Sequence, residues 1–129
     1  MENTLSMDLD FIFAVARYPS LYDPADHNFD NAHINAIRIG KVVDELRLLR
    51  IRSNFEEVTH AWVQSKWAGL VCFWRWMQSQ YQKDGPSALV SMSTRHLVIL
   101  RELDFLSHCY TGYIILEGII EEELDSRSA

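Results

Sequence analysis

Apolar residues recur at every third or fourth position in four stretches of this 129-residue chain. That spacing is typical of amphipathic helices and predicts them over about residues 8–17, 31–49, 55–83 and 94–107. The expected buried stripe of the first helix is Leu9, Ile12, Phe13 and Ala16, and that of the second is Ile39, Val42, Val43, Leu46 and Leu49, flanked by Ile34. The third helix should bury Val63, Trp67, Leu70, Trp74, Met77 and Tyr81. The fourth should bury Leu97, Leu100, Leu103 and Leu106. The pattern therefore predicts an all-α fold.

The first predicted helix must end before Pro19. Proline lacks an amide donor and disfavours helical geometry at the preceding residue, which is Tyr18. Leu21, Tyr22 and Pro24 follow within a few residues. A turn this apolar is typical of a corner packed into a helical core, and we expect it to be fixed and buried.

The other helix ends carry their own signals. Asn31 is a suitable N-cap for the second helix, and Ser53 with Glu56 fits a capping box before the third. The sequence Asp84-Gly85-Pro86 should stop the third helix. The serine-rich segment 87–94 is expected to connect it to the fourth.

The last segment, about residues 110–124, has mixed propensity. Its first half is β-branched and contains glycine, which favours a strand, whereas its second half is rich in glutamate and favours a helix. We expect a helix, because the preceding elements are all helical. Since neither a repeat nor a linker interrupts the chain, the sequence predicts a single compact helical domain.

Composition narrows the class of protein. Hydrophobic residues make up 48% of the chain and the formal net charge is −6, so we expect a globular core and no general affinity for nucleic acid or anionic membranes. The longest apolar windows are too short to cross a bilayer, and the N-terminus does not resemble a signal peptide. Cys72 and Cys109 lie on apolar stretches, which suggests buried, reduced thiols in a soluble intracellular protein.

Four pieces of the sequence, taken in order, resemble one known family. They are Phe11-Ile12 with Val15, Tyr18-Pro19 and Leu21-Tyr22-Asp23-Pro24; Phe29; Trp67, Leu70 and Trp74; and Leu103, Phe105 and Leu106. Over about residues 9–106 the chain is similar to a MADF domain, the Myb/SANT-like helical module of many animal transcription factors. The resemblance implies a three-helix core with one or two additional C-terminal helices, and a nuclear setting in transcription or chromatin regulation. Residues 107–125 would be a helical extension that packs on the domain or on a partner.

Two departures from the family pattern concern the second and third helices. The family usually has Trp in the second helix where this chain has Ile39, an apolar-for-apolar change. In the third helix the family continues after leucine with basic residues, whereas this chain has Leu70-Val71-Cys72-Phe73. If the third helix is the one that enters a DNA groove, it has lost much of its positive charge.

The cations that remain define a DNA-binding alternative. A DNA-reading helix needs several side chains that neutralise phosphates, and the third helix offers Lys66, Arg75 and Lys83. A second basic cluster lies in and after the second helix, at Arg38, Lys41, Arg47, Arg50 and Arg52. The alternative interpretation of that cluster is a solvated helix face with local ion pairs.

The third helix also has a second apolar face, formed by Trp62, Gly69, Phe73 and Trp76. A helix that is apolar nearly all round must be covered on both sides. The cover is either the C-terminal segment of the same chain, through Ile114, Ile115 and Ile119, or another protein chain, including a second copy. These six aromatic and isoleucine residues are the candidate partner-binding residues.

The sequence offers little support for catalysis. The five histidines lie in unrelated contexts, and neither metal-ligand spacing, a phosphate-binding loop nor a nucleophile motif occurs. We expect no enzyme activity, no metal, no cofactor, no small-molecule substrate and no membrane association. The sequence favours a non-catalytic protein–protein interaction module of a nuclear regulator, acting as a homodimer or with another protein. The alternative is a sequence-specific DNA-binding domain that uses the third helix.

Overall fold

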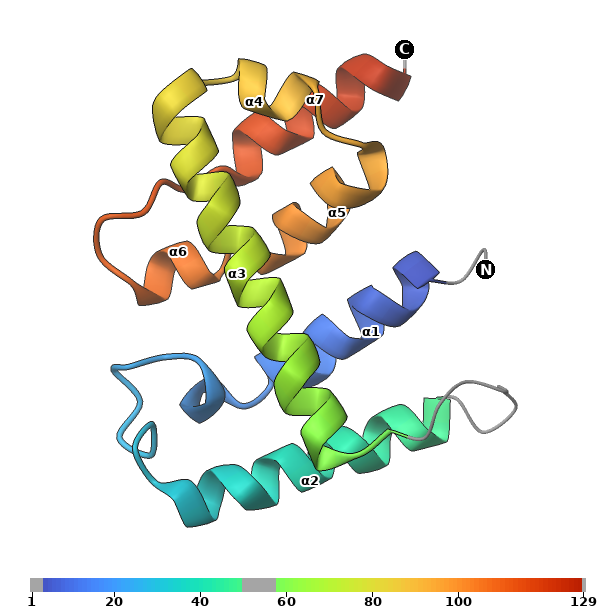
Figure 1. Ribbon diagram of the computed structural model, residues 1–129, viewed down its shortest axis with the longest axis vertical. Coiled ribbons are helices and arrows are strands. Elements are labelled where there is room, and N and C mark those ends of the chain that lie inside the picture. The colour runs from blue at the N-terminus through green and yellow to red at the C-terminus, as the bar shows by residue number, and fades with distance from the viewer. Residues whose placement is uncertain (1–3, 50–57, 129) are drawn as a thin grey trace. The chain divides into compact units, whose positions relative to one another are not determined.

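The computed structural model describes residues 4–49 and 58–128, and every regular element within these ranges is helical (Figure 1). The all-α prediction is confirmed for this part of the chain. None of the described helices combines the length and the hydropathy needed to span a membrane. The elements, in order, are α1 (Thr4–Ala16), the 3-10 helix η1 (Pro19–Leu21), α2 (Ala32–Leu49), α3 (His60–Asp84), α4 (Ser87–Val90), α5 (Thr94–Leu103), α6 (Leu106–Cys109) and α7 (Glu117–Ser128).

The chain divides into two compact units, Met1–Leu70 and Val71–Ala129, and the boundary falls inside α3. Unit 1 contains α1, η1, α2 and the first turns of α3. Unit 2 contains the remaining turns of α3 and the helices α4 to α7. The domain limits implied by the family resemblance, 9–106 and 107–125, stay predictions.

The core of unit 1 forms where α1 packs against α2 and η1 packs against both. The buried face of α1 carries Phe11, Ile12 and Val15, and the ring of Phe11 meets Trp62 of α3 edge-on at 5.7 Å between centroids. Phe13 is exposed, so the prediction that it belongs to the core stripe is wrong. Successive helical residues differ by about 100° around the axis, and burying Phe11 therefore turns Phe13 towards solvent.

The turn after α1 is fixed by side chains, as the sequence predicts, but it is buried only in part, since Pro19 and Pro24 are exposed. Tyr18 adopts φ −120° and ψ 82°, outside the helical region, and Pro19 begins η1. Tyr22 is buried, and its hydroxyl donates to the carbonyl oxygen of Ala16 at 2.7 Å. The buried hydroxyl of Ser20 donates to Oδ1 of Asn35 on α2 at 2.6 Å.

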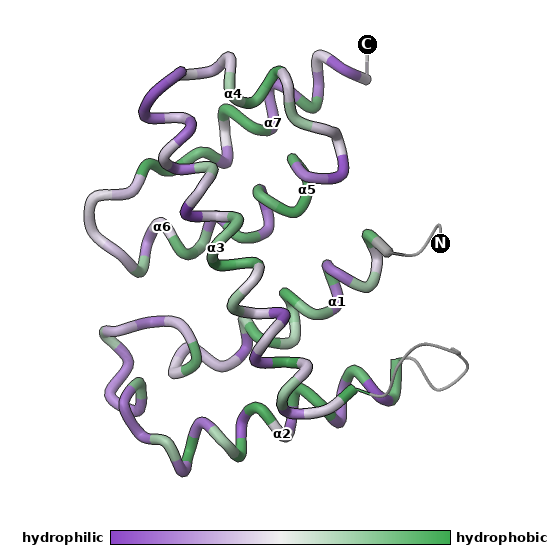
Figure 2. Tube along the Cα trace, in the orientation of Figure 1, coloured by the Kyte–Doolittle hydropathy of each residue, from purple (hydrophilic) through white to green (hydrophobic). Residues whose placement is uncertain are grey.

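Helix α2 begins where the sequence predicts, since Oδ1 of Asn31 accepts the N–H of Ile34 at 3.0 Å. Hydrophilic and hydrophobic residues alternate along it (Figure 2), and Val42, Val43 and Leu46 are buried. Leu49 is exposed, so the predicted core stripe of this helix extends one position too far.

Helix α3 begins at His60, later than the predicted residue 55. Val58 and Thr59 are not helical, and Oγ1 of Thr59 accepts the N–H of Trp62 at 3.1 Å, which makes Thr59 the capping residue. The predicted capping box, Ser53 with Glu56, lies outside the described residues.

The core of unit 2 surrounds the second half of α3 and the leucines of α5. Trp74 and Met77 are fully buried, and so are Leu97, Leu100, Leu103 and Leu106, which confirms that predicted stripe. The rings of Tyr110 and Tyr113 lie 6.1 and 4.6 Å from the ring of Trp74. Helix α7 lies against α4 and α5 (Figure 1).

The end of α3 follows the prediction: it stops at Asp84, and Gly85 takes a positive φ of 65° while its N–H donates to the carbonyl of Tyr81 at 2.8 Å. The connection that follows contains the short helix α4, which the sequence did not predict. The helix expected over 94–107 is interrupted at Asp104. Aspartate is a poor residue for a helix interior, and this one binds the start of another helix.

The C-terminal segment is half helix. Residues 110–116 form an irregular connection, and α7 begins only at Glu117, so the helix prediction is wrong for the β-branched half. The expectation of two buried thiols is also wrong. Cys72 is exposed on α3, and Cys109 is half-buried.

Candidate functional site

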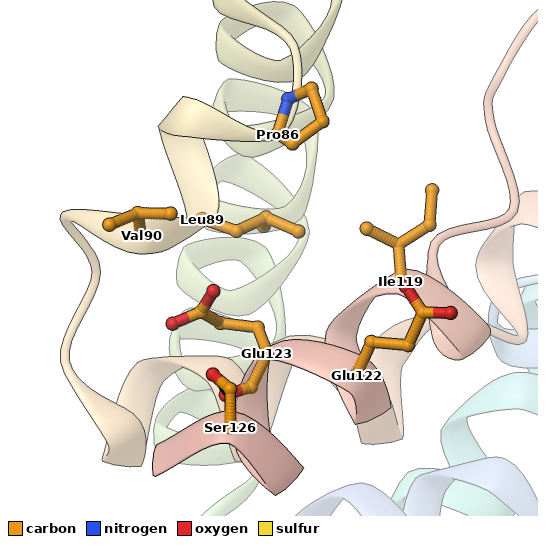
Figure 3. A pocket seen from close by; sticks show the side chains of 7 residues that line it. All are labelled: Pro86, Leu89, Val90, Ile119, Glu122, Glu123 and Ser126. Carbon is orange, nitrogen blue, oxygen red and sulfur yellow. Dashed lines mark hydrogen bonds between the residues drawn. The ribbon is translucent and has the colours of Figure 1, made fainter.

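A groove lies between α4 and α7 in unit 2 (Figure 3). Its volume is about 200 Å³. Apolar side chains come from α4 and the turn before it, whereas α7 contributes one isoleucine and the polar side chains that line the other side of the groove. The lining residues are Pro86, Leu89, Val90, Ile119, Glu122, Glu123 and Ser126.

The start of α7 is fixed by Asp104, a buried residue at the end of α5. Its Oδ1 and Oδ2 accept the N–H of Leu116 at 3.1 and 3.2 Å, and Oδ2 accepts the N–H of Glu117 at 3.0 Å. The hydroxyl of Ser107 donates to Oδ1 at 3.2 Å. Asp104 therefore caps a helix to which it does not belong, and its negative charge lies at the positive end of the dipole of α7.

The connection before α7 is fixed to α3 through Gln78, whose side chain is buried. The amide nitrogen Nε2 donates to the carbonyl oxygen of Ile114 at 2.7 Å, and Oε1 accepts the N–H of Ile114 at 2.9 Å. The hydroxyl of Ser107, whose one hydrogen also faces Oδ1 of Asp104, lies 3.1 Å from the same carbonyl oxygen and shares that hydrogen between the two acceptors. Both backbone groups of Ile114 are thus paired, which sets the path of this segment.

The end of α7 is attached to α4 by Arg127. Its guanidinium donates to the carbonyl oxygens of Leu89 and Val90 at 3.1 and 3.0 Å, which are terminal carbonyls of α4. Its Nε forms an ion pair with Oε2 of Glu123 at 2.8 Å, one turn earlier on α7. Because α7 is fixed at both ends, the groove beside it is a preformed feature of unit 2.

Among the described residues of unit 2, three large apolar side chains remain exposed. The exposed fractions are 55% for Trp76 on α3, 53% for Ile115 and 62% for Val90 at the edge of the groove. Exposure of a tryptophan on a regular helix is unusual, because tryptophan normally buries most of its surface. Cys72, Arg75 and Ser79 are also exposed on this part of α3.

The six predicted partner-binding residues lie in different environments. Trp62 belongs to unit 1, where it packs against Phe11 and beneath the ammonium group of Lys66. Phe73 is half-buried beside the ring of His96, and Ile114 is half-buried beside Gln78. The remaining three are more available: Trp76 and Ile115 are exposed, and Ile119 lines the groove.

Three of the predicted DNA-binding residues already have partners within unit 1. Lys66 pairs with the buried carboxylate of Asp8 at 2.5 Å, and Arg38 donates to the hydroxyl of Ser20 at 2.6 Å. Nε of Arg47 donates to the carbonyl of Val58 at 2.9 Å.

The other cations divide into two groups. Arg75 and Lys83 on α3, and Lys41 on α2, are exposed and have no hydrogen-bond or ion-pair partner among the described residues. Arg50 and Arg52 lie outside the described residues. Of the predicted DNA-binding residues that the structure describes, the three free cations are thus divided between two helices.

Within residues 4–49 and 58–128 no three His, Cys, Asp or Glu side chains gather in a way that could hold a metal ion. Unit 1 has a small apolar hollow of about 70 Å³, lined by Val15, Leu21, Ile39, Val63, Gln64 and Trp67. It brings together residues from α1, η1, α2 and α3.

Sequence analysis missed the groove, because it treated residues 87–94 as a connection. Pro86 followed by Leu89 and Val90 was an available signal, since proline favours the first turn of a helix. The roles of Asp104 and Arg127 depend on contacts between distant segments and have no local signature.

Comparison of the chain with protein-family models, with curated proteins and with solved structures found no match.

Proposed function

We propose that this chain is a non-catalytic protein–protein interaction module that binds its partner through the exposed apolar residues of unit 2. The observation that carries this proposal is Trp76, which is 55% exposed on a long, regular helix. Tryptophan is among the residues most enriched at the energetic centre of interfaces. Ile115 and Val90 add apolar surface to the same unit, and its groove provides a preformed recess.

The expected contribution of Trp76 follows from its exposed area. A tryptophan presents about 250 Å² of surface, so 55% exposure leaves about 140 Å² for a partner to cover. At about 25 cal/mol per Å², covering it contributes about 3 kcal/mol, or roughly a hundredfold in affinity. Truncating this one side chain should therefore reduce binding strongly.

The groove fits a protein partner better than a small molecule. Ligand pockets for drug-sized molecules occupy about 300–1,000 Å³, whereas this groove measures about 200 Å³. A recess of that size matches one aliphatic or aromatic side chain. Its apolar wall of Leu89, Val90 and Ile119 would receive that side chain.

The proposed setting is nuclear, in transcription or chromatin regulation. The support for it is the resemblance to a MADF domain, carried chiefly by the segment Phe11–Pro24. A fluorescent fusion of the full chain should accumulate in the nucleus. A purely cytoplasmic distribution would remove the support for this setting.

The DNA-binding alternative has weaker support. Of the third-helix cations, Lys66 is committed to Asp8, which leaves Arg75 and Lys83 as free donors for phosphates. Two cations give a shallow salt dependence and low affinity, because duplex binding scales with the number of phosphates neutralised. Titrating a labelled duplex at low salt, with Arg75→Glu and Lys83→Glu as a double variant, measures this alternative directly.

The test of the proposed function isolates the chain from cells that express it and compares the proteins that co-purify. Three forms are compared: the wild type, Trp76→Glu and a control variant. The wild type should retain a defined set of proteins that Trp76→Glu loses. The matched control is Gln82→Glu, which adds the same charge at another exposed position of α3. Circular dichroism should be unchanged for all three forms, since position 76 is largely solvated.

Two results would overturn the proposal. One is an identical set of co-purified proteins for the wild type and for Trp76→Glu. The other is unfolding of Trp76→Glu, because it would mean that Trp76 stabilises the fold and is not available to a partner.

A further inference from the structure

The outer face of α2 in unit 1 is an exposed stripe made of Ile37, Lys41, Asp44 and Leu48. These positions are four, three and four residues apart, so at about 100° per residue they fall within about 60° of one another around the helix. The buried residues Val42, Val43 and Leu46 lie on the opposite side. The stripe therefore points away from the core of unit 1.

The stripe has an apolar residue at each end. Ile37 is 47% exposed and Leu48 is 72% exposed. Between them, Lys41 and Asp44 are exposed and have no partner among the residues that the structure describes. One helix thus presents the order apolar, positive, negative, apolar.

This order is complementary to itself when the helix is reversed. If a second α2 lies antiparallel across the first, with the two-fold axis midway between Lys41 and Asp44, Ile37 of each copy meets Leu48 of the other. In the same register, Lys41 of each copy meets Asp44 of the other. A two-fold interface requires this reciprocity: if residue i meets residue j, then j meets i.

We propose that α2 is a self-association surface that pairs antiparallel with α2 of a second copy of this chain. The pairing buries four exposed aliphatic side chains and forms two ion pairs. A parallel arrangement in register would instead place Lys41 beside Lys41 and Asp44 beside Asp44, which is repulsive. The charges therefore select the antiparallel orientation.

The expected association is weak. One face of one helix buries less surface than a standard interface, and interfaces below about 1,200 Å² are typical of transient complexes. The dissociation constant should be on the order of 100 μM. The surface lies in unit 1, so it is independent of Trp76 and of the groove in unit 2.

The first test is sedimentation equilibrium of the full chain from about 10 μM to about 1 mM. The wild type should pass from monomer to dimer, and Leu48→Glu should weaken dimerisation at least tenfold. The matched control is Leu49→Glu, which adds the same charge at an exposed position about 100° around the helix. It should dimerise like the wild type.

The second test uses charge reversal and restoration. Lys41→Asp alone and Asp44→Lys alone should each remain monomeric, because each replaces two attractions by two repulsions. A mixture of the two variants should form a heterodimer, since every contact between positions 41 and 44 is then again between opposite charges. A single chain with both substitutions should dimerise like the wild type.

Restoration in the mixture distinguishes the proposal from simple misfolding, because two misfolded proteins would not repair each other. The proposal is overturned if the wild type is monomeric throughout, if Leu49→Glu disrupts as much as Leu48→Glu, or if the mixed charge variants stay apart. Trp76→Glu should leave the dimer intact. If α2 does not self-associate, the function proposed for unit 2 therefore still stands. If that function is wrong, the self-association proposed for α2 still stands.

Discussion

Replacing Asp104 by alanine should release α7 from unit 2. The carboxylate of Asp104 accepts the N–H groups of Leu116 and Glu117 and the hydroxyl of Ser107, at 3.0 to 3.2 Å. Hydrogen bonds to a charged acceptor contribute about 1.5–3 kcal/mol each before the cost of burying the charge, and an N-cap contributes about 1 kcal/mol net. Leu116 is fully buried, so its N–H would lose its partner in an apolar environment, at about 1–3 kcal/mol.

Together these terms give a loss of about 3 kcal/mol for Asp104→Ala, or roughly a hundredfold increase in the opening of α7. Asp104→Asn keeps one acceptor oxygen and should lose about half as much. Hydrogen exchange of the amides in residues 116–128 is the appropriate assay, because two compact units need not unfold together. Urea unfolding followed by circular dichroism gives the global value.

The control for charge is Asp125→Asn, which removes a carboxylate from an exposed position of α7 and should change stability by less than about 0.5 kcal/mol. If Asp104→Ala and Asp125→Asn behave alike in the exchange experiment, Asp104 does not cap α7. The account of how the groove wall is held would then be incorrect.

Three further predictions concern unit 2 and follow from single contacts. Gln78→Ala should cost about 2 kcal/mol and expose the amide of Ile114 to hydrogen exchange, because two hydrogen bonds to that backbone disappear. Trp74→Phe should lower the free energy of unfolding in urea by less than about 1.5 kcal/mol. The buried indole N–H has no partner among the described residues, so removing it offsets part of the packing that is lost. A loss above about 3 kcal/mol would show that the indole makes a needed hydrogen bond. Gly85→Ala should destabilise the protein by about 1 kcal/mol, because Gly85 has a positive φ. Gly118→Ala should stabilise it by about 0.5 kcal/mol, because a side chain at this helical position meets open space. If both substitutions shift the thermal unfolding temperature in the same direction, this reasoning is contradicted.

The helices and most of the core were predictable because they depend on local periodicity and local capping. Asn31, Pro19 and Gly85 each act within a few residues of their own position, and the structure confirms all three. The leucine stripe of α5 and α6 is equally local, because each member follows the last at a step of three positions.

The sequence-based predictions fail in two situations. In one, two nearby apolar residues of a helix could each face the core; in the other, a contact joins segments that are far apart in the sequence. Phe11 and Phe13 have similar propensities, and Phe11 is the one buried because it packs against Trp62 and Trp67 of α3. Asp104 ends α5 because it binds N–H groups twelve and thirteen residues further along the chain. No window of sequence around Asp104 contains that information.

The candidate site was predicted only in part for the same reason. Trp76 was identified from helical spacing, and Ile115 and Ile119 as apolar residues of the C-terminal segment; the three are exposed or line the groove. Leu89 and Val90 form the α4 wall of the groove. This wall depends on Arg127, near the C-terminal end of the chain, whose guanidinium donates to their carbonyl oxygens. Such a contact becomes visible only once the chain is folded.

The most direct test of the interaction proposal is site-specific photo-crosslinking in cells, with benzoylphenylalanine in place of Trp76. We expect a discrete protein adduct from position 76 and none from the exposed control position Gln82 on the same helix. Adducts of equal yield at both positions, adducts to nucleic acid alone, or the absence of any adduct at position 76 would contradict it.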